Sequence, residues 1–598
     1  MLTIRGGNGL KKTHIAILFL FSSILILSAC DQSTDEVSNV SVEHDYIDGF
    51  NQAIISDEPA LDGGEITFGI VSDSPFQGVL NYNFYVNNRD RDIIDWFDEP
   101  LLALDANDTY TQDGAANYDV DHDDQSITLT IRDDVNWHDG NPVTAEDWAY
   151  AYEVIGHPDY EGPRYGADMR MIEGMEAYHS GESEEISGIT IHDEKSLTIQ
   201  YERLTPSLLA NGIWPYALPK HVFEAYEVSE MASSEEVRQS PIGMGPFKVE
   251  RVVPGESVLL TKNEDYWRGE PNLDQVTIKV IGTQVATEHL RSGEVDILNQ
   301  FPTDQYVENQ DLENITFLGD IDFTYTYIGF KLGEWDDESG QNVMHEDAKM
   351  GDVKLRRAMW YAVDHDQLGE ELFDGLRWNA TTLVPPTHPD YHDESIETPT
   401  YDPEQAEDLL DEAGYVDVTG DGFREDPDGE PLEINFASVA GGDTALPMAQ
   451  YYVQSWQDIG LNVELAGGQL MDNNVLFDRL ENDDPDIDVY VSAWAVGTDV
   501  NPEPLYGRYA PFNYSRYTSE RQDELLEKGL SEEAFDMEYR QEVYSEWQAY
   551  MAEQVPVFPM HYRMQIVPVH DRVSNYAVHF NEDTGIHRYQ LGVTEETD

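Results

Sequence analysis

The sequence predicts an α/β protein that is built of more than one lobe. Its 598 residues exceed the length that one hydrophobic core usually organises. Hydrophobic residues make up 40% of the chain and aromatic residues 11%, which is typical of a packed globular protein and excludes a disordered one. Strand patterns and amphipathic helix patterns alternate along the chain, and this alternation indicates an α/β fold.

The N-terminal segment predicts export. A positively charged start precedes an apolar run over residues 15–27, which is shorter than the roughly 20 residues that a membrane-spanning helix needs. Leu27-Ser28-Ala29-Cys30 then resembles the lipobox of bacterial lipoproteins, in which the cysteine becomes the lipidated first residue. We therefore expect a lipoprotein signal peptide over residues 1–29 and a lipid anchor at Cys30, on the outer face of the cytoplasmic membrane. Cys30 is the only cysteine, so no intramolecular disulfide can form, and no later stretch is apolar enough to cross a bilayer.

The charge of the chain is extreme. Lys and Arg number 34 against 118 Asp and Glu, for a net charge of −84. Such a surface repels nucleic acid and anionic lipid, so we expect no nucleic-acid partner. It also repels itself, and salt screens that repulsion, with a Debye length of about 3 Å at 1 M against 10 Å at 0.1 M. A halophilic, very salty setting is therefore predicted, and alkaline surroundings are the alternative.

Local patterns predict the first elements in chain order. Residues 30–62 are acidic, contain much Ser and Asn and lack periodicity, so we expect a flexible acidic tether. Residues 63–68 open the folded part as a strand. Residues 127–131 alternate apolar and polar side chains, which is the period of a half-buried strand. Thr144, followed three residues later by Asp147, then predicts the capped start of an amphipathic helix.

Helices and strands continue to alternate in the rest of the chain. Asp402 as N-cap, Pro403 at the first helical position and Gly414 beyond the end predict a helix over residues 403–413. The glycines of Gly243-Met244-Gly245 should permit a tight bend before a strand that begins at Phe247. The remaining predicted elements are helices over residues 352–364, 450–459 and 522–547 and strands over residues 196–201, 462–465 and 489–494.

Short motifs along the chain match one protein family in sequence and in order. The longest comprises Arg132, Trp137, Asp139, Gly140, Pro142, Thr144, Ala145 and Asp147, and the others are Leu218-Pro219-Lys220-His221 and segments within residues 243–249, 263–267, 290–297 and 352–364. On these motifs the chain resembles the family 5 extracellular solute-binding proteins of ABC importers, over about residues 63–593. It looks most like the large oligopeptide-binding lipoproteins of Gram-positive bacteria.

The resemblance implies a periplasmic-binding-protein-like fold, with two lobes that close on ligand about a hinge and an extra domain. It also implies a monomer that captures a peptide ligand outside the cytoplasm, hands it to the permease subunits of an ABC transporter and is not an enzyme. The implied parts are residues 63–103 for the start of lobe I, 104–213 for extra domain II, 214–320 for the second part of lobe I, 321–554 for lobe III and 555–598 for the C-terminal part of lobe I.

The stretch over residues 489–509 carries the candidate ligand site. A strand is predicted to end at Trp494, and a Gly-containing loop then presents Asp499. In oligopeptide-binding members of the family a Trp lines the ligand channel and an Asp shortly after it pairs with the peptide's α-amino group. The resemblance assigns these roles to Trp494 and Asp499. The spacing differs by two residues from that of enteric members, and a loop cap is the alternative role for Asp499.

A structural Ca²⁺ is the only cofactor that the sequence suggests. Asp417, Thr419, Asp421, Glu425 and Asp428 have the oxygen-ligand spacing of an EF-hand loop, with Gly at the sixth position. The twelfth position is Asp in place of Glu, and no flanking pair of EF-hand helices is evident. A simple turn of Gly and Asp is the alternative.

Other functions are compatible with parts of the sequence. Within the same family the alternatives are binders of dipeptides, oligosaccharides or nickel. A secreted hydrolase is the alternative from a different class, because a glycosidase needs two carboxyl groups about 5–10 Å apart in a cleft. The chain contains no P-loop lysine, no His-Glu-x-x-His and no Gly-x-Ser-x-Gly, so the sequence supplies no recognisable catalytic motif.

The net charge predicts a protein whose stability depends steeply on salt. Because NaCl screens the repulsion between surface carboxylates, the melting temperature should rise strongly from low to molar NaCl at constant pH. Differential scanning calorimetry measures this rise. A melting temperature that does not change over that range would contradict the screening argument.

Overall fold

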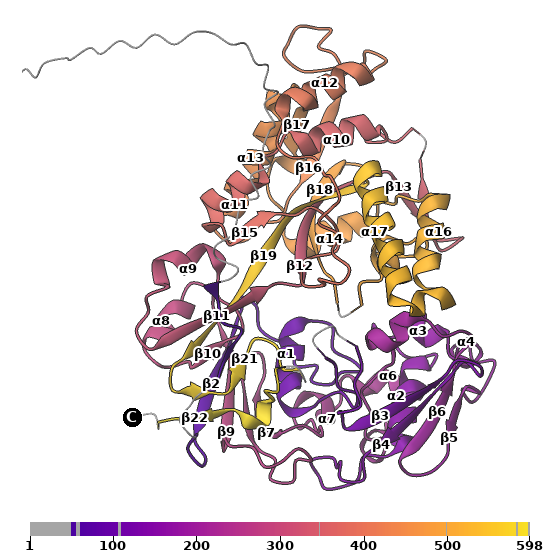
Figure 1. The fold of residues 1–598 in the computed structure, drawn as a ribbon, viewed down its shortest axis with the longest axis vertical. Helices are drawn as coiled ribbons and strands as arrows, with labels where there is room; N and C mark the ends of the chain where they lie inside the picture. Colours follow the sequence, from indigo (N-terminus) through magenta and orange to yellow (C-terminus); the bar gives the residue numbers. More distant parts are fainter. Residues whose placement is uncertain are drawn as a thin grey trace, which may run out of the picture. The chain divides into compact units, whose positions relative to one another are not determined.

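Two of the predicted lobes share one large β-sheet. The computed structural model describes residues 49–55, 60–105, 109–345, 347–497, 499–581 and 584–595. Within them the largest sheet has 12 strands, in the order β17-β16-β18-β12-β19-β10-β2-β9-β8-β7, and β11 and β15 pair with β19 beside this path. Parallel and antiparallel strands are mixed and helices accompany the sheet, so the fold is α/β, as predicted (Figure 1).

The long strand β19 (Val557–His570) belongs to both lobes (Figure 1). Its first half pairs with β12 (Thr324–Phe330) and β15 (Arg377–Asn379) of lobe III. Its second half pairs with β11 (Ile315–Ile321) and β10 (Ile297–Leu298) of lobe I. The predicted return to lobe I at residue 555 is therefore too early, because the ladder with β12 keeps residues 557–561 in lobe III.

Lobe I contains the predicted strand that opens the folded chain. That strand, β2 (Glu65–Val71), runs parallel to β9 (Gln275–Ile281) and β10, and antiparallel β8 (Ser257–Lys262) and β7 (Phe247–Val253) complete this side of the sheet. The helices here are α1 (Asn88–Phe97), α8 (Ala286–Arg291) and α9 (Thr303–Asn309). The C-terminal segment adds β20 (Val573–Ser574), β21 (Tyr576–Ala577), η5 (Arg588–Gln590) and β22 (Gly592–Val593).

The extra domain has its own antiparallel sheet. Its strand order is β3 (Ala116–Asp121), β4 (Ser126–Ile131), β6 (Ser196–Gln200) and β5 (Ile189–Ile191). Helix α2 (Ala145–Gly156) begins with the predicted capping box, in which Asp147 N donates to Thr144 Oγ1 at 3.2 Å and Thr144 N donates to Asp147 Oδ2 at 2.9 Å. The other helices are α3 (Ala167–Arg170), α4 (Met175–His179), η2 (Leu208–Gly212), α5 (Lys220–Phe223), α6 (Val228–Met231) and α7 (Glu235–Arg238).

The core of the extra domain extends beyond its predicted end at residue 213. Phe223, Met231 and Val237 belong to the same buried cluster as Ile127 and Trp148. A sheet must bury its apolar face against further apolar side chains, and α5 to α7 supply part of that cover. These three helices therefore complete the extra domain, although the sequence placed them in lobe I.

Lobe III covers its part of the large sheet on both faces. Its further strands are β13 (Gly333–Asp336), β14 (Gln341–Met344), β16 (Glu433–Ala437), β17 (Asn462–Leu465) and β18 (Val489–Ala495). Its helices are α10 (Val353–Tyr361), α11 (His365–Phe373), α12 (Pro403–Ala413), α13 (Ala445–Asp458), η3 (Ala466–Gly468), α14 (Asn473–Glu481), α15 (Glu503–Tyr506), α16 (Glu520–Gly529), η4 (Glu532–Phe535) and α17 (Met537–Gln554). Along β12, Tyr325 and Tyr327 join the core of α14, α16 and α17, whereas Ile328 and Phe330 join that of α10, α12 and α13.

One helix of lobe III begins and ends as predicted, and another is interrupted. At α12, Asp402 accepts from Gln405 N at 2.9 Å and Gly414 adopts a φ of 92°. The single helix predicted over residues 522–547 is wrong, because α16 and α17 are separate. A Cβ at Gly529 would lie 2.3 Å from the Tyr544 ring, so the end of α16 packs directly on α17.

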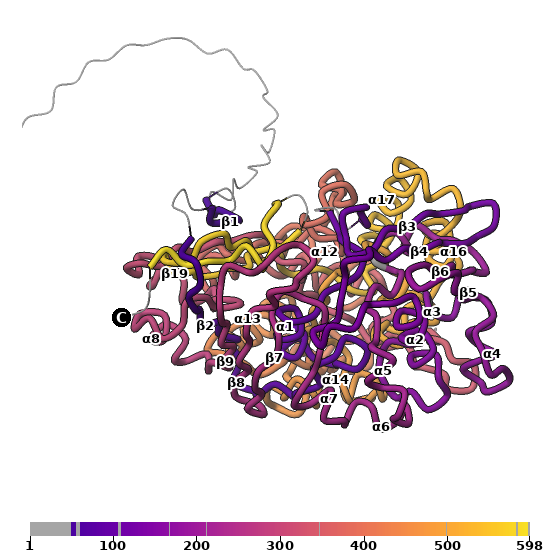
Figure 2. Tube along the Cα trace, turned by 90° about the horizontal axis from the view of Figure 1, so that it is seen from below, coloured from indigo at the N-terminus to yellow at the C-terminus, as the bar shows by residue number. Residues whose placement is uncertain are grey.

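The end of the predicted tether belongs to lobe I. Strand β1 (Ala53–Ile54) pairs with β21 and lies beside the C-terminal strands (Figure 2). The Phe50 ring lies 5.3 Å from that of Tyr306 and fills the space over Gly319, where a Cβ would meet Phe50 Cγ at 2.7 Å. The tether predicted through residue 62 is therefore wrong for this segment, because its aromatic side chain is packed. Cys30 and the predicted signal peptide lie outside the described residues.

The Gly243-Met244-Gly245 motif lies at the predicted bend before β7 and also serves close packing. Neither glycine has the left-handed backbone that glycine favours. A Cβ at Gly243 would lie 2.4 Å from Phe97 O, and one at Gly245 would lie 2.8 Å from Phe97 C. Asp98 Oδ1 accepts from Met244 N at 3.1 Å, so the motif lies against the end of α1. Glycine is needed because two backbones touch.

A methyl group added at Gly243 should destabilise the protein. We expect Gly243→Ala to lower the free energy of unfolding by about 1–3 kcal/mol, because the crowded atoms are backbone and cannot rotate away. Gly166→Ala is the matched control, since a Cβ there meets nothing within 4 Å. Urea unfolding measures both variants, and equal midpoints for Gly243→Ala and the wild type would contradict the packing role.

Candidate functional site

Trp494 lies in a group of aromatic rings at the end of β18. In the antiparallel ladder between β18 and β12, Trp494 pairs with Tyr325. The Trp494 ring stacks on Tyr514, with centroids 5.7 Å apart and planes 23° apart, and on Tyr327 at 6.4 Å and 21°. Phe512 meets the same ring edge-on at 5.8 Å. We call Tyr327, Trp494, Phe512 and Tyr514 the aromatic platform.

Only part of the aromatic platform is accessible. Tyr327 and Tyr514 are buried, Trp494 is half-buried and Phe512 is 49% exposed. Exposed aromatic carbon beside a rigid stack is a surface that binds apolar groups of a ligand. Sequence reasoning identified Trp494 but missed Phe512 and Tyr514, although the aromatic-rich run over residues 506–517 was a signal for them.

Asp499 has a partner within the protein. Its Oδ1 accepts from Nη2 of Arg540 at 2.8 Å, and the two side chains are 18% and 5% exposed. Nη2 of Arg540 also donates to Ser207 Oγ of the extra domain at 3.2 Å and to Tyr544 OH at 3.4 Å. Burial lowers the pKa of Arg540, but the charge of Asp499, with smaller contributions from tyrosines, raises it by more. Arg540 therefore stays charged, and its contact with Asp499 joins α17 to the loop after β18.

A second carboxylate, that of Asp168, faces the same place from the extra domain. The side chain of Asp168 makes no hydrogen bond or ion pair with any residue in the described ranges. Burial, together with the nearby charges of Asp499 and Glu503, raises the pKa of Asp168 to about 7. The pKa of Glu503 is also raised, because burial outweighs the attraction of Arg170 and Arg203. Sequence reasoning missed Asp168, since no sequence pattern places α3 beside the loop after β18.

These side chains form a junction between the extra domain and lobe III. We call Asp168, Asp499, Glu503 and Arg540 the carboxylate junction. Arg540 pairs with Asp499, and Arg170 and Arg203 attract Glu503, but the pKa of Asp168 stays raised, so a further cation beside Asp168 would be stabilised. An ammonium group fits this environment, because it offers three hydrogen-bond donors that can rotate to meet carboxylate oxygens.

The predicted calcium loop is only partly assembled. Carboxylate oxygens of Asp417, Asp421 and Glu425 lie within 4.8 Å of one another, and Glu425 is buried. Asp428 is not in this group, because its N–H donates to Asp426 Oδ1 at 2.9 Å in a separate turn, and Thr419 is exposed. Three clustered oxygen ligands suit Ca²⁺ chemically, although Asp417 also accepts from two backbone N–H groups of the loop. Calcium binding stays a prediction.

Comparisons with known proteins agree along nearly the whole chain. The model of the family described as bacterial extracellular solute-binding proteins, family 5 Middle, matches residues 109–516. The oligopeptide-binding protein OppA of Lactococcus lactis subsp. lactis is 28% identical over 584 residues, which cover 95% of this chain and 96% of that protein. The oligopeptide-binding protein AppA of Bacillus subtilis (strain 168) is 26% identical over 480 residues, which cover 79% of this chain and 80% of AppA. The structure of lactococcal OppA, complexed with an endogenous peptide in the closed conformation, has a TM-score of 0.80 at 27% identity, and covers 89% of this chain and 100% of that one.

Calcium at the three clustered carboxylates predicts a response to chelation. In protein equilibrated with Ca²⁺, a chelator should lower the melting temperature by about 2 °C or more, because a ligand that binds only the native state stabilises it. Asp421→Asn should remove the response, whereas Asp428→Asn, outside the cluster, should keep it. Calorimetry at fixed ionic strength compares them. Identical melting curves with and without chelator would exclude a structural Ca²⁺ at this loop.

Proposed function

Because the chain belongs to the bacterial extracellular solute-binding proteins of family 5, we propose that it captures oligopeptides outside the cytoplasm. It delivers them to the permease subunits of an ABC transporter, acts as a monomer and releases its ligand unchanged. The observation that carries the proposal is the similarity, along nearly the whole chain, to a lactococcal oligopeptide-binding protein whose structure contains a peptide.

Peptide binding of this kind uses the main chain of the ligand. An extended peptide offers the same N–H and C=O groups whatever its sequence, so main-chain hydrogen bonds give affinity with weak sequence preference. The aromatic platform takes apolar side chains of the peptide. The lobes close about β19, which is supported by the pairing of that strand with both lobes.

The proposal places the protein on the outer face of the cytoplasmic membrane, through lipid on Cys30. The support is the lipobox of the sequence, since Cys30 lies outside the described residues. None of the helices in the described ranges is both long enough and apolar enough to cross a bilayer. A structural Ca²⁺ at Asp417, Asp421 and Glu425 is part of the same proposal.

The carboxylate junction binds the α-amino group of the peptide. A charge that becomes buried between closing lobes must be paired, because an unpaired buried charge is very costly. Asp499 already has Arg540 as its partner, and Arg170 and Arg203 attract Glu503, so Asp168 is the carboxylate of the junction whose charge is least compensated. The ammonium group lies between Asp168 and Asp499, and this contact sets the register of the peptide.

Calorimetry with one oligopeptide, in free-amine and N-acetylated forms, tests the function and the site. Acetylation should weaken binding to the wild type by on the order of 30-fold or more, because removing one member of a buried charge pair costs about 2–5 kcal/mol. Asp168→Asn should weaken only the free-amine form and lose most of the discrimination, so the two changes are not additive. Glu161→Gln, at an exposed acid of the extra domain, is the matched control.

The outcomes separate the alternatives. Intact peptide recovered after binding supports a binding protein, whereas cleavage would indicate a hydrolase. Retention of dipeptides, oligosaccharides or nickel in place of oligopeptides would overturn the ligand class. With the Asp168 pKa at about 7, the free-amine affinity should also fall roughly tenfold from pH 7 to pH 5.5, as the carboxylate becomes protonated. Effects of acetylation and Asp168→Asn that simply add would exclude Asp168 and leave peptide binding itself intact.

A further inference from the structure

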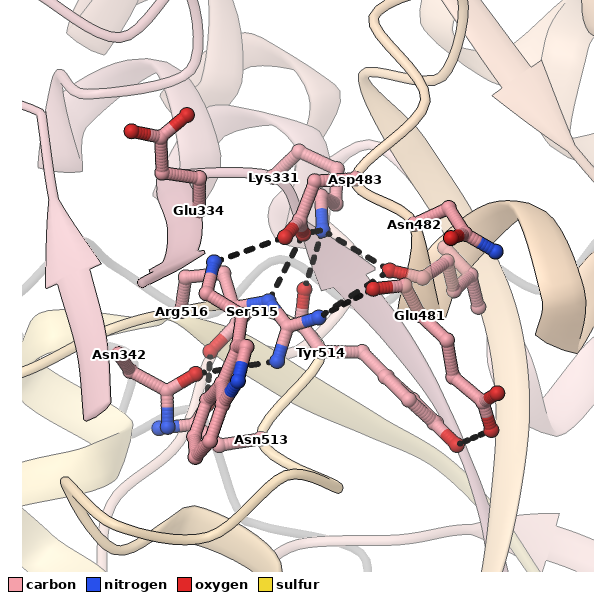
Figure 3. A network of polar contacts seen from close by, with 12 residues as sticks. Lys331, Glu334, Asn342, Glu481, Asn482, Asp483, Asn513, Tyr514, Ser515 and Arg516 are labelled. Atoms are coloured by element: carbon pink, nitrogen blue, oxygen red, sulfur yellow. Dashed lines mark hydrogen bonds and ion pairs between the residues drawn. The ribbon is translucent and has the colours of Figure 1, made fainter. Parts of the chain in front are cut away.

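The loop that carries Phe512 and Tyr514 is held by buried polar side chains from elsewhere in lobe III (Figure 3). Nδ2 of Asn342, on β14, donates to the carbonyls of Gly507, Arg508 and Ala510 at 3.2, 3.0 and 2.9 Å. Nζ of Lys331, just after β12, donates to Tyr514 O at 3.0 Å. The loop is therefore fixed before and after Phe512, although Phe512 itself is 49% exposed.

Asp483 is the acceptor at the centre of this arrangement. It accepts from Nε of Arg516 at 2.8 Å, from Trp335 N at 2.8 Å and from Nζ of Lys331. The side chains of Asp483, Lys331 and Arg516 are only 15%, 10% and 1% exposed. Burial lowers the pKa of Lys331 to about 8, against the attraction of Asp483. We call Lys331, Asn342, Asp483 and Arg516 the Asp483 network.

Arg516 connects three segments through its planar guanidinium. Nη1 donates to Asn342 Oδ1 at 3.1 Å and to Pro511 O at 3.0 Å. Nη2 donates to Leu480 O at 3.3 Å and to Glu481 O at 3.2 Å, at the end of α14. A lysine could not make these contacts together, because its ammonium is a single point and not a fork.

The backbone of the network is strained where its central ion pair lies. Asp483 has a φ of 49° and Arg516 a φ of 58°, in the left-handed region that residues with a side chain seldom adopt. Residues in this region carry a cost in free energy and persist where their surroundings determine them, often at ligand-binding sites. Glycine would relieve the strain at either position but would remove the contacts that hold the loop.

We infer that the Asp483 network positions the aromatic platform to bind a large apolar side chain of the ligand. The inference rests on the proposed function and deepens it, because it names the residues that hold the platform in place for an apolar side chain of the peptide. Arg516 holds Pro511 O and Lys331 holds Tyr514 O, one on each side of Phe512. The Phe512 ring thus stays against Trp494 while about half of the residue's surface remains exposed. An aromatic surface that is fixed beforehand loses little conformational entropy when ligand binds.

Affinity measurements with a set of oligopeptides test the inference. Each peptide carries a single Phe in place of Ala at one internal position, and the Phe-to-Ala affinity ratio at the best position is the readout. We expect a ratio of about tenfold or more for the wild type, the value of burying one large apolar side chain. Asp483→Asn, which keeps the size of the side chain and tolerates the left-handed backbone, should reduce the ratio to below about threefold.

The neighbouring residue supplies a matched control. Asp484 accepts from Nε of Arg479 at 2.7 Å at the same end of α14, and among the described residues neither side chain makes a hydrogen bond or ion pair with the loop that carries Phe512. Asp484→Asn should therefore lose an ion pair and keep the Phe preference. Phe512→Ala should lose the preference as Asp483→Asn does, and the double variant should lose no more than either alone.

Two results would overturn the inference. One is that Asp483→Asn weakens Phe and Ala peptides by the same factor, which is the behaviour of a residue that only stabilises the fold. The other is that Phe512→Ala keeps the preference. If Asp483→Asn does not fold, Lys331→Met replaces it, because the Asp483–Arg516 pair remains, and a smaller loss of the ratio is expected.

Failure of the proposed function would give a different experimental result from failure of this inference. A wild type that binds none of the peptides contradicts peptide capture, and hydrogen exchange then decides whether the network fixes the loop. Amides over residues 507–517 should exchange faster in Asp483→Asn than in the wild type or Asp484→Asn. Unchanged exchange there would overturn the positioning role.

Discussion

The hydrogen-bonded ladder along β19 is the interaction on which the rest of the structure depends. One half of the strand pairs with β12 and the other with β11, so the two lobes are parts of one sheet. Strand β12 also pairs with β18, and this second ladder places Tyr325 opposite Trp494 and so sets the position of the aromatic platform. A slip of one residue would turn every side chain of the strand to the opposite face, which both cores forbid. Motion between the lobes must therefore twist β19 and leave its register intact.

Buried arginines support the ends of this strand in a chain that has few cations. Arg356 donates to the carbonyls of Gln554 and Val555 just before β19, at 2.7 Å each. Arg572, just after it, makes two hydrogen bonds with Asp296, at 2.7 and 2.8 Å. Such buried contacts are screened by salt much less than contacts between surface charges. Salt thus weakens the repulsion between surface carboxylates more than it weakens these buried arginine contacts.

The two halves of the candidate site differ in what assembles them. All four residues of the aromatic platform come from lobe III, so that surface exists whether or not the extra domain is close. The carboxylate junction needs Asp168 and Ser207 from the extra domain together with Asp499 and Arg540 from lobe III. The position of the aromatic platform therefore depends on lobe III alone, whereas the carboxylate junction depends on the contact between lobe III and the extra domain.

The sequence by itself determined the α/β class, the family and the local elements. Thr144 with Asp147 and Asp402 with Gly414 are correct helix ends, and Trp494 is correctly placed at the end of a strand. These features depend on backbone hydrogen bonds and side-chain periodicity over a few residues, so residues that are neighbours in the sequence are enough to predict them. The similarity to the family predicted a site region on the same basis.

Only the tertiary structure decided which distant segments meet. It gave Asp499 the partner Arg540, brought Asp168 to the same junction and left Asp428 out of the carboxylate cluster. It also showed that Gly243 is required by contact with Phe97 and that Phe512 is held beside Trp494. Each of these outcomes depends on atoms that are far apart along the chain and close in space. Neither composition nor local periodicity encodes such a distance, because it is set by how the whole chain packs.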